Sequence, residues 1–161
     1  MKITNRTFLL ISAVIGVAIF FASCSKSEGI KPVNTGANNI ALKGYDAVAY
    51  FTENKPVEGK DVYQFTWNGV TWNFSSEANR DSFAKNPEKY APQYGGYCSY
   101  AVSHGYTADG DPQAWKIVDG KLYLNYNQKA KEAWEKDIPN NIKNGNDNWQ
   151  KFLKKKPEHK E

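Results

Sequence analysis

The dipeptide Asn68-Gly69 lies in the middle of an aromatic-rich segment and predicts a β-hairpin over about residues 62–74. With Asn68 and Gly69 as the two loop residues, the apolar residues of the strands face one another in three pairs: Trp67 with Val70, Phe65 with Trp72, and Tyr63 with Phe74. A slip of one residue would mix these side chains with the polar ones of the other face, so the register is well specified.

A second hairpin is predicted over about residues 114–125, with Asp119-Gly120 as its turn. This turn makes two apolar pairs, Ile117 with Leu122 and Trp115 with Leu124. The two hairpins are not separated by a regular alternation of strand and helix, which favours an antiparallel arrangement over a parallel sheet.

Helical segments are predicted between and after the hairpins. Each has a recognisable start: Ser75 or Ser76 caps a helix through Lys85, Pro87 begins a short turn through Tyr90, Asn127 caps a helix through Lys136, and an amphipathic piece follows Asp147. We therefore expect a small single α+β domain over residues 40–153, in which the hairpins pack against short helices. Its length is enough for one hydrophobic core.

The N-terminus has the features of a bacterial lipoprotein signal. Lys2 and Arg6 precede an uncharged apolar run from Phe8 to Ala22, which is shorter than the roughly 20 residues of a membrane span. The run ends in Phe-Ala-Ser-Cys, which resembles a lipobox and predicts residues 1–23 as a signal peptide with lipid attached to Cys24. The alternative is an uncleaved signal anchor in which Cys24 has no role.

Lipidation of Cys24 would anchor the chain to a bacterial membrane, facing the periplasm or the exterior, with the lipid bilayer as its partner. Residues 24–39 are predicted to be a flexible tether and residues 154–161 a basic polar tail. Loss of the signal would lower the net charge from +4 to +2 because Lys2 and Arg6 leave with it. A charge this small argues against nucleic-acid binding.

The stretch from Gly69 to Cys98 has a distinctive order: an aromatic strand, a capped helix ending at Asn-Pro, and a Gly-Gly-Tyr-Cys turn. This order resembles the YHS domain family, which is related to the heavy-metal-binding TRASH domains. The resemblance covers about residues 40–127 and implies the fold, together with a metal as the first ligand to consider.

The metal-binding cysteines of that family are absent from this chain. In metal-binding members the strand-to-helix junction reads roughly F-C-S-x-x-C, and Ser75 and Asn79 occupy the two cysteine positions here. A third family cysteine, in a D-P-V-C-G-M-like segment, corresponds best to Ala49 within Asp46 to Tyr50. The resemblance therefore implies the fold without specifying the ligand.

Cys98 and His104 are the candidate chemical groups of the domain. A thiolate and an imidazole can bind Cu or Zn, and they can also act as nucleophile and base if they meet in space. A buried structural cysteine beside a surface histidine is the remaining interpretation. The only other histidine, His159, lies in the tail. One cysteine and one histidine make an incomplete metal site unless oxygen ligands or a second chain complete it.

We expect a ligand-binding module rather than an enzyme, with its site at the Cys98 loop. The site residues expected are Cys98, His104, Tyr97, Tyr45 and Asp46, with Cys98 and His104 as metal ligands. Asp46 has the alternative role of accepting backbone N–H bonds in the turn that opens the domain. Tyrosines near Cys98 are suited to lining an apolar cleft with polar tips. The alternatives are a thiol-dependent redox or transfer enzyme, a scaffold for another envelope protein, and a homodimer that shares a site through Cys98.

Overall fold

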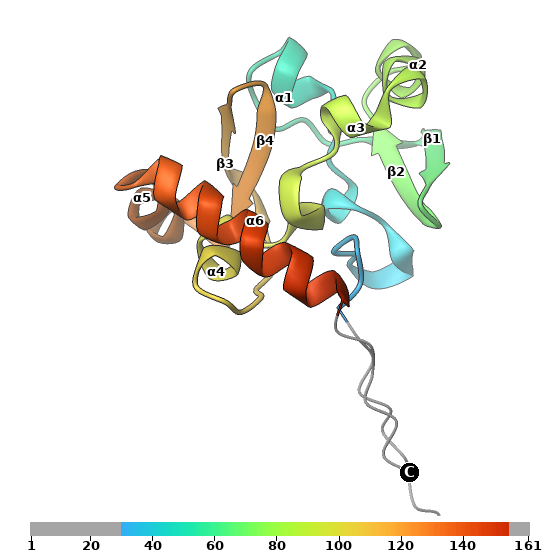
Figure 1. Cartoon of the computed structure of the whole chain (residues 1–161). Helices are drawn as coiled ribbons and strands as arrows, with labels where there is room; N and C mark the ends of the chain where they lie inside the picture. The colour runs from blue at the N-terminus through green and yellow to red at the C-terminus, as the bar shows by residue number, and fades with distance from the viewer. Residues whose placement is uncertain (1–29, 155–161) are drawn as a thin grey trace, which may run out of the picture.

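The computed structural model describes residues 30–154, and these form a small α+β domain with two separate two-stranded antiparallel sheets (Figure 1). The first predicted hairpin is β1 (Lys60–Trp67) with β2 (Val70–Phe74), and the second is β3 (Asp111–Val118) with β4 (Lys121–Asn125). The helices are α1 (Ala49–Thr52), α2 (Glu77–Lys85), α3 (Pro87–Tyr90), α4 (Ser99–Ser103), α5 (Gln128–Glu135) and α6 (Ile138–Lys154). Three short 3₁₀ turns lie at Ala37–Asn39, Leu42–Gly44 and Gln93–Gly96.

The register of the first hairpin is confirmed near its turn and wrong farther away. Trp67 pairs with Val70 and Phe65 with Trp72, as predicted, but Phe74 pairs with Lys60 instead of Tyr63. An irregularity in β1 between Lys60 and Gln64 displaces the pairing. Extra residues in one strand of an antiparallel pair make such a bulge, which a regular alternation of side chains cannot predict.

Both predicted apolar pairs of the second hairpin are present, Ile117 with Leu122 and Trp115 with Leu124. Its first strand begins at Asp111, slightly before the predicted start. The hairpin is therefore defined mainly by its Asp-Gly turn and by the apolar residues of its two strands.

Side-chain caps begin three of the predicted helices at the expected places. The side-chain oxygens of Ser76, Asn86 and Asn127 accept hydrogen bonds from backbone N–H groups in the first turns of α2, α3 and α5. Each cap satisfies a donor that has no partner inside the helix. The local sequence thus specifies where these helices start.

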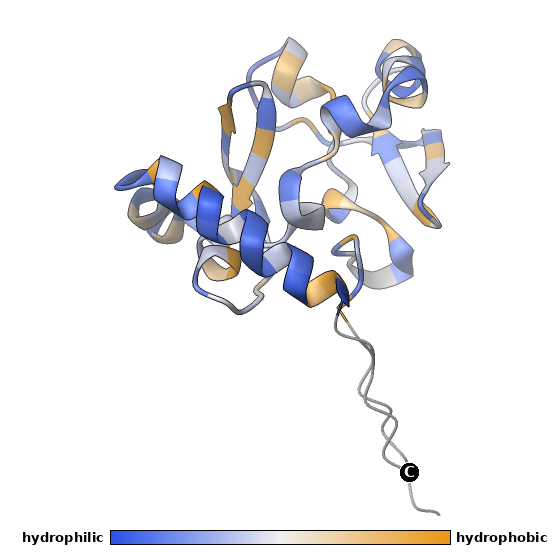
Figure 2. Ribbon diagram, in the orientation of Figure 1, coloured by the Kyte–Doolittle hydropathy of each residue, from blue (hydrophilic) through white to orange (hydrophobic). Residues whose placement is uncertain are grey.

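The last helix is much longer than predicted. Helix α6 begins at Ile138, whereas only the piece after Asp147 was expected to be helical. Its first half is rich in asparagine, which favours turns and caps over helix interiors, and Figure 2 shows mostly hydrophilic residues along it. The Asn141 amide donates to the carbonyl of Trp134 at 2.8 Å, and the Asn148 amide donates to that of Val102 at 3.0 Å. These tertiary bonds to the ends of α5 and α4 compensate for the low helix propensity.

Two clusters of buried side chains make up the interior. The first packs both hairpins against α1 and α2, with Phe83 of α2 against Trp72 at a ring separation of 4.9 Å. The second joins α4, α5 and α6 around Trp134 and Tyr123, whose rings are 5.1 Å apart. Within residues 30–154 no helix is long and apolar enough to cross a membrane.

Part of the predicted tether lies against the domain. Val33 is buried in the first cluster, and the backbone N–H of Asn34 donates to the carbonyl of Gly95 at 2.8 Å. Gly95 has a φ of +60°, and a Cβ there would collide with the carbonyl of Pro32. This glycine therefore permits both the left-handed turn and the close approach of the upstream chain.

Candidate functional site

Asp46 is fully buried and accepts five hydrogen bonds. Its Oδ1 accepts from the backbone N–H groups of Val48 at 2.8 Å and Ala49 at 3.2 Å. Its Oδ2 accepts from the N–H of Ser75 at 2.8 Å, the Ser75 hydroxyl at 2.7 Å and the Asn79 amide at 2.7 Å. Both carboxylate oxygens are therefore occupied by protein donors, which is what burying an ionised carboxylate requires.

The three positions where the resemblance places family cysteines all meet this carboxylate. Ser75 and Asn79 contact it with their side chains, and Ala49 does so through its backbone N–H. In this chain, these three positions supply hydrogen-bond donors to one carboxylate. Asp46 links the start of α1 to the β2–α2 junction by accepting these bonds, and it does not line the cleft at Cys98.

Cys98 is buried at the start of α4. Its sulfur accepts a hydrogen bond from the Ala101 N–H at 3.4 Å and lies 3.9 Å from Oδ1 of Asn125. The same Asn125 oxygen accepts from the N–H of Tyr100 at 3.1 Å. The Nδ2 of Asn125 and the hydroxyl of Ser99 are also buried, and neither has a hydrogen-bond partner among the described residues. Unpaired polar groups of this kind are uncommon in protein interiors.

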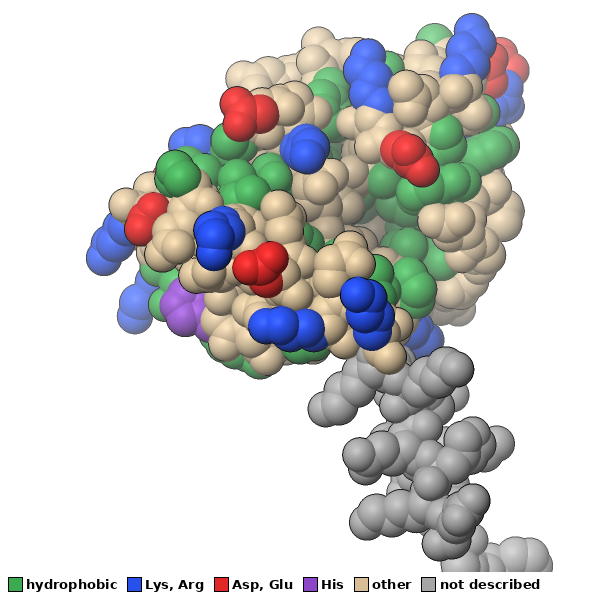
Figure 3. Space-filling model, viewed as in Figure 1, with side chains coloured by type: hydrophobic (Ala, Val, Ile, Leu, Met, Phe, Trp, Pro, Cys, Tyr) green, Lys and Arg blue, Asp and Glu red, His purple; other side chains and the backbone are tan. Residues whose placement is uncertain are grey.

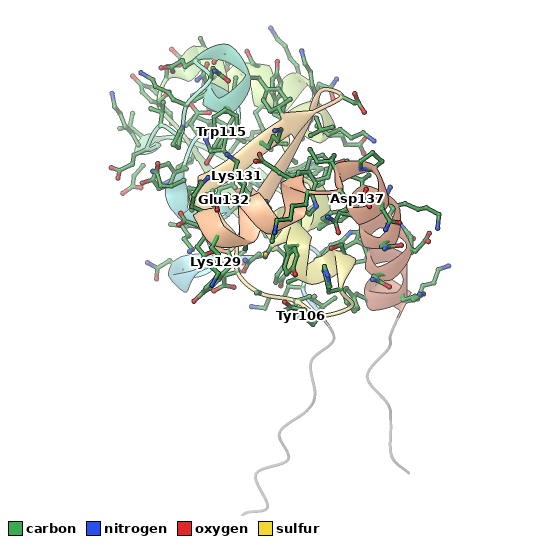
Figure 4. All side chains as sticks on the ribbon, turned by 90° about the vertical axis from the view of Figure 1, so that its left-hand side faces the viewer. Tyr106, Trp115, Lys129, Lys131, Glu132 and Asp137 are labelled. Carbon is green, nitrogen blue, oxygen red and sulfur yellow. The ribbon has the colours of Figure 1, made fainter. Side chains whose placement is uncertain are left out.

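A cleft of about 400 Å³ opens beside Cys98. It lies between α4 with the loop after it and the start of α5, and Figure 4 shows Tyr106 and Lys129 on this side of the molecule. The lining comes from three separated segments: Cys98, Tyr100, Ala101, Tyr106, Ala108, Tyr126, Asn127, Lys129, Ala130 and Ala133. Three tyrosine rings and four alanines make the cleft predominantly apolar, and its volume falls within the range of about 300–1,000 Å³ that is usual for small-molecule sites.

His104 does not line this cleft. Its Nδ1 lies 2.8 Å from the carbonyl oxygen of Tyr100 and 3.0 Å from the hydroxyl of Ser103, and its ring stacks on that of Tyr100 at 4.2 Å. The side chain is exposed at the end of α4. Among residues 30–154 no hydrogen bond joins His104 to Cys98. The structure therefore does not assemble the predicted Cys98–His104 pair.

Tyr97 and Tyr45 lie elsewhere. The Tyr97 ring packs against Trp149 of α6 at 5.8 Å, and burial, with a smaller effect of Asp109, raises the pKa of its hydroxyl. The Tyr45 hydroxyl donates to the Glu58 carboxylate at 3.3 Å and accepts from Gln113 at 3.4 Å. The five expected site residues are therefore spread over several places, and Cys98 alone of them lines the tyrosine cleft.

The described residues do not fit a mononuclear metal site. Nowhere in residues 30–154 do three or more histidine, cysteine, aspartate or glutamate side chains form a group that could hold a metal ion. Cys98 would supply one sulfur, whereas structural Zn sites usually need four protein ligands. A Cu or Zn ion at Cys98 would need ligands from outside this part of the chain.

The first hairpin and the capped helix α2 lie within a segment that matches a known family. Residues 48–94 match the family model of the YHS domain. No curated protein and no solved structure matches the chain. The match confirms the resemblance over this segment and supports a metal-related binding module in general terms.

The YHS match includes Ala49, Ser75 and Asn79, the three positions that contact the Asp46 carboxylate, and it ends at Tyr94. Cys98 and the tyrosine cleft follow it in the chain, so the cleft is built by residues beyond the matched segment. Sequence reasoning predicted tyrosines around Cys98 but could not identify Tyr126 and Ala130 as its neighbours. The signal available was the Asn127 cap, which places the start of α5 directly after β4.

Proposed function

We propose that this chain is a lipid-anchored protein of the bacterial cell envelope whose YHS-containing domain is a ligand-binding module. Lipid on Cys24 would tie the domain to a membrane, and the cleft around Cys98 would be its ligand site. One observation carries the proposal: the buried thiol of Cys98 lines the same cleft as the rings of Tyr100, Tyr106 and Tyr126.

The chemistry of the lining favours a small apolar or aromatic organic ligand with a polar end. Tyr106 and Tyr126 are 52% and 58% exposed, so their rings are accessible for stacking on a planar molecule. Asn127 and Lys129 supply polar groups at the same cleft. The role of Cys98 would be to form part of the inner wall.

A transition metal, Cu or Zn, is the second candidate ligand, and the YHS match favours it. Cys98 is the free cysteine of the described residues, and two copies of the chain could each contribute its sulfur. Such a shared site would bind one metal ion per two chains. A thiol-dependent enzyme is less favoured because His104, the expected base, is bonded to Tyr100 and Ser103.

Filling the cleft should weaken ligand binding without unfolding the domain. The full chain would be screened against a library of small aromatic compounds, with a rise in melting temperature as the readout. Ala130→Leu should weaken the affinity of the hits at least about tenfold, because the added side chain occupies ligand volume. Ala78→Leu, an equivalent change on the exposed part of α2, is the matched control.

Two outcomes of this screen would contradict the organic-ligand proposal. One is that the hits bind Ala130→Leu as well as the unaltered chain, which would place their site elsewhere. The other is that no compound binds while Cu or Zn binds stoichiometrically and is lost in Cys98→Ser. One metal ion per two chains would then establish the shared site.

Membrane anchoring is tested separately at Cys24. Cys24→Ser should move the chain from the membrane fraction to the soluble or secreted fraction, because the thiol that would receive the lipid is gone. The unaltered chain should also gain the mass of acyl groups at its N-terminus. Retention of Cys24→Ser in the membrane, with no acyl groups on the unaltered chain, would favour an uncleaved signal anchor.

A further inference from the structure

A second cleft, of about 360 Å³, lies between the two core clusters. Figure 3 shows the molecule hollowed between its two halves, on the face that α6 crosses in Figure 1. Four parts of the chain line this cleft: Pro32 and Val33, the tip of the first hairpin, the segment from α3 to the glycine turn, and the last turns of α6. The cleft has no lining residue in common with the tyrosine cleft at Cys98.

Aromatic rings reach this cleft from both clusters. Trp67 of β1 belongs to the first cluster and is tilted against Trp72 at a ring separation of 5.8 Å. Trp149 of α6 belongs to the second cluster and packs against Tyr94 at 6.1 Å. Trp67 and Trp149 are only partly buried, so each indole exposes part of its surface. A flat apolar ligand face could stack on either ring.

The polar side chains of the cleft are mostly without protein partners. Of the five Asn, Gln and Glu side chains that line the cleft, those of Asn68, Glu88, Gln93 and Gln150 make no hydrogen bond or ion pair with another described residue, and all but Gln93 are exposed to solvent. The remaining amide of the lining, that of Asn146, is paired: its oxygen accepts a hydrogen bond from the Tyr94 hydroxyl at 3.1 Å. Each amide offers both donors and an acceptor, and Glu88 accepts only.

The charge of the lining limits the ligand. None of the described residues around this cleft is a lysine, arginine or histidine. Phosphates, nucleotides and carboxylate ligands are normally held by such cations or by bound metal, so they are poorly matched to a lining whose one charged side chain is Glu88. A neutral ligand that both donates and accepts hydrogen bonds fits better.

We propose that this cleft binds a neutral pyranose sugar, either free or as part of a glycan. A pyranose ring has a patch of C–H groups on its faces and hydroxyl groups around its rim. Its faces match the indoles of Trp67 and Trp149, and its hydroxyls match the unpaired amides of Asn68, Gln93 and Gln150. The site is distinct from the Cys98 cleft and does not depend on the function proposed for it.

The test is a titration of the full chain with neutral monosaccharides and oligosaccharides, followed by tryptophan fluorescence. Two of the lining indoles are partly exposed, so stacking of a sugar should change their emission. The detergent must carry no sugar headgroup, because alkyl glycosides would compete for the site. We expect at least one neutral saccharide to saturate the signal below about 10 mM, which corresponds to a weak but specific site.

A double variant that should fold normally tests whether the sugar binds in this cleft. Asn68→Gly suits the turn because Asn68 already has a positive φ of 51°, and Gln150→Ala lies on the exposed side of α6. The double variant should weaken sugar binding about 5- to 50-fold, as expected for two lost hydrogen-bonding side chains. The matched control is Asn38→Gly with Gln128→Ala, which removes an exposed asparagine at φ 63° and an exposed helical glutamine away from the cleft.

Binding that the double variant weakens and the control retains would support the proposal. A higher affinity for oligosaccharides than for their monosaccharides would identify a glycan chain as the source of the pyranose. Absence of saturation by every neutral saccharide would overturn the proposal. Equal binding by the double variant, or stronger binding of nucleosides or aromatic acids at the same residues, would overturn it as well.

Discussion

Asp46→Ala is expected to lower the free energy of unfolding by about 4 kcal/mol, the largest effect of any single substitution considered for this domain. The change would leave five donors facing a buried space without an acceptor: three backbone N–H groups, the Ser75 hydroxyl and the Asn79 amide. Chemical denaturation of the full chain, followed by circular dichroism, measures the effect. Asp46→Asn should also destabilise the domain, because its NH₂ group would point at donors.

Asp119→Asn is the matched control for this experiment. Asp119 lies exposed in the β3–β4 turn, and asparagine is equally suited to its positive φ of 49°. We expect the control to change stability by no more than about 0.5 kcal/mol. A loss of less than about 1 kcal/mol in Asp46→Ala would show that the buried carboxylate does not organise the domain.

Gly95→Ala is expected to have the second largest effect, a loss of about 3 kcal/mol of stability. Part of the loss comes from the left-handed backbone, with φ at +60°, and the rest from collision of the new Cβ with the Pro32 carbonyl. The upstream segment would have to move away, which would break the hydrogen bond from Asn34 to the Gly95 carbonyl.

Gly69→Ala separates these two contributions. Gly69 has a similar φ of +71° in the first hairpin turn, but a Cβ there would meet nothing within 4 Å. It should therefore cost only the backbone term of about 1 kcal/mol. Hydrogen exchange at Asn34 should become faster in Gly95→Ala and stay unchanged in Gly69→Ala. Equal destabilisation by the two substitutions would mean that the packing of the upstream chain contributes little.

The predictable parts of this fold are those determined by neighbouring residues. Asn68-Gly69 and Asp119-Gly120 specify tight turns, and Asn127 specifies a helix start, because each acts through its own local hydrogen bonds and backbone angles. The pairing of Phe74 could not be predicted in the same way, since it depends on the irregularity in β1.

Features that depend on contacts between residues far apart in the sequence could not be predicted. Helix α6 is stabilised by bonds from Asn141 in its first half and Asn148 in its second half to helices earlier in the chain, and the sequence of α6 alone does not contain those partners. The role of Asp46 likewise needs Ser75 and Asn79 to be close in space. Cys98 and His104 were candidates because of their chemistry, and a spacing of six residues does not decide whether the two side chains meet. The turn at the end of α4 directs His104 to the surface.

The most direct test of the Cys98 cleft is the rate at which this thiol is alkylated in the folded full chain, measured by mass spectrometry with and without a compound selected by melting temperature. Cys98 is only 1% exposed, so we expect slow modification that starts from the cleft and becomes slower still as the compound saturates its site. We expect the protection of Cys98 to follow ligand occupancy and to be weaker in Ala130→Leu. An alkylation rate that stays constant from free to fully bound protein would contradict it, because the ligand would then bind away from Cys98.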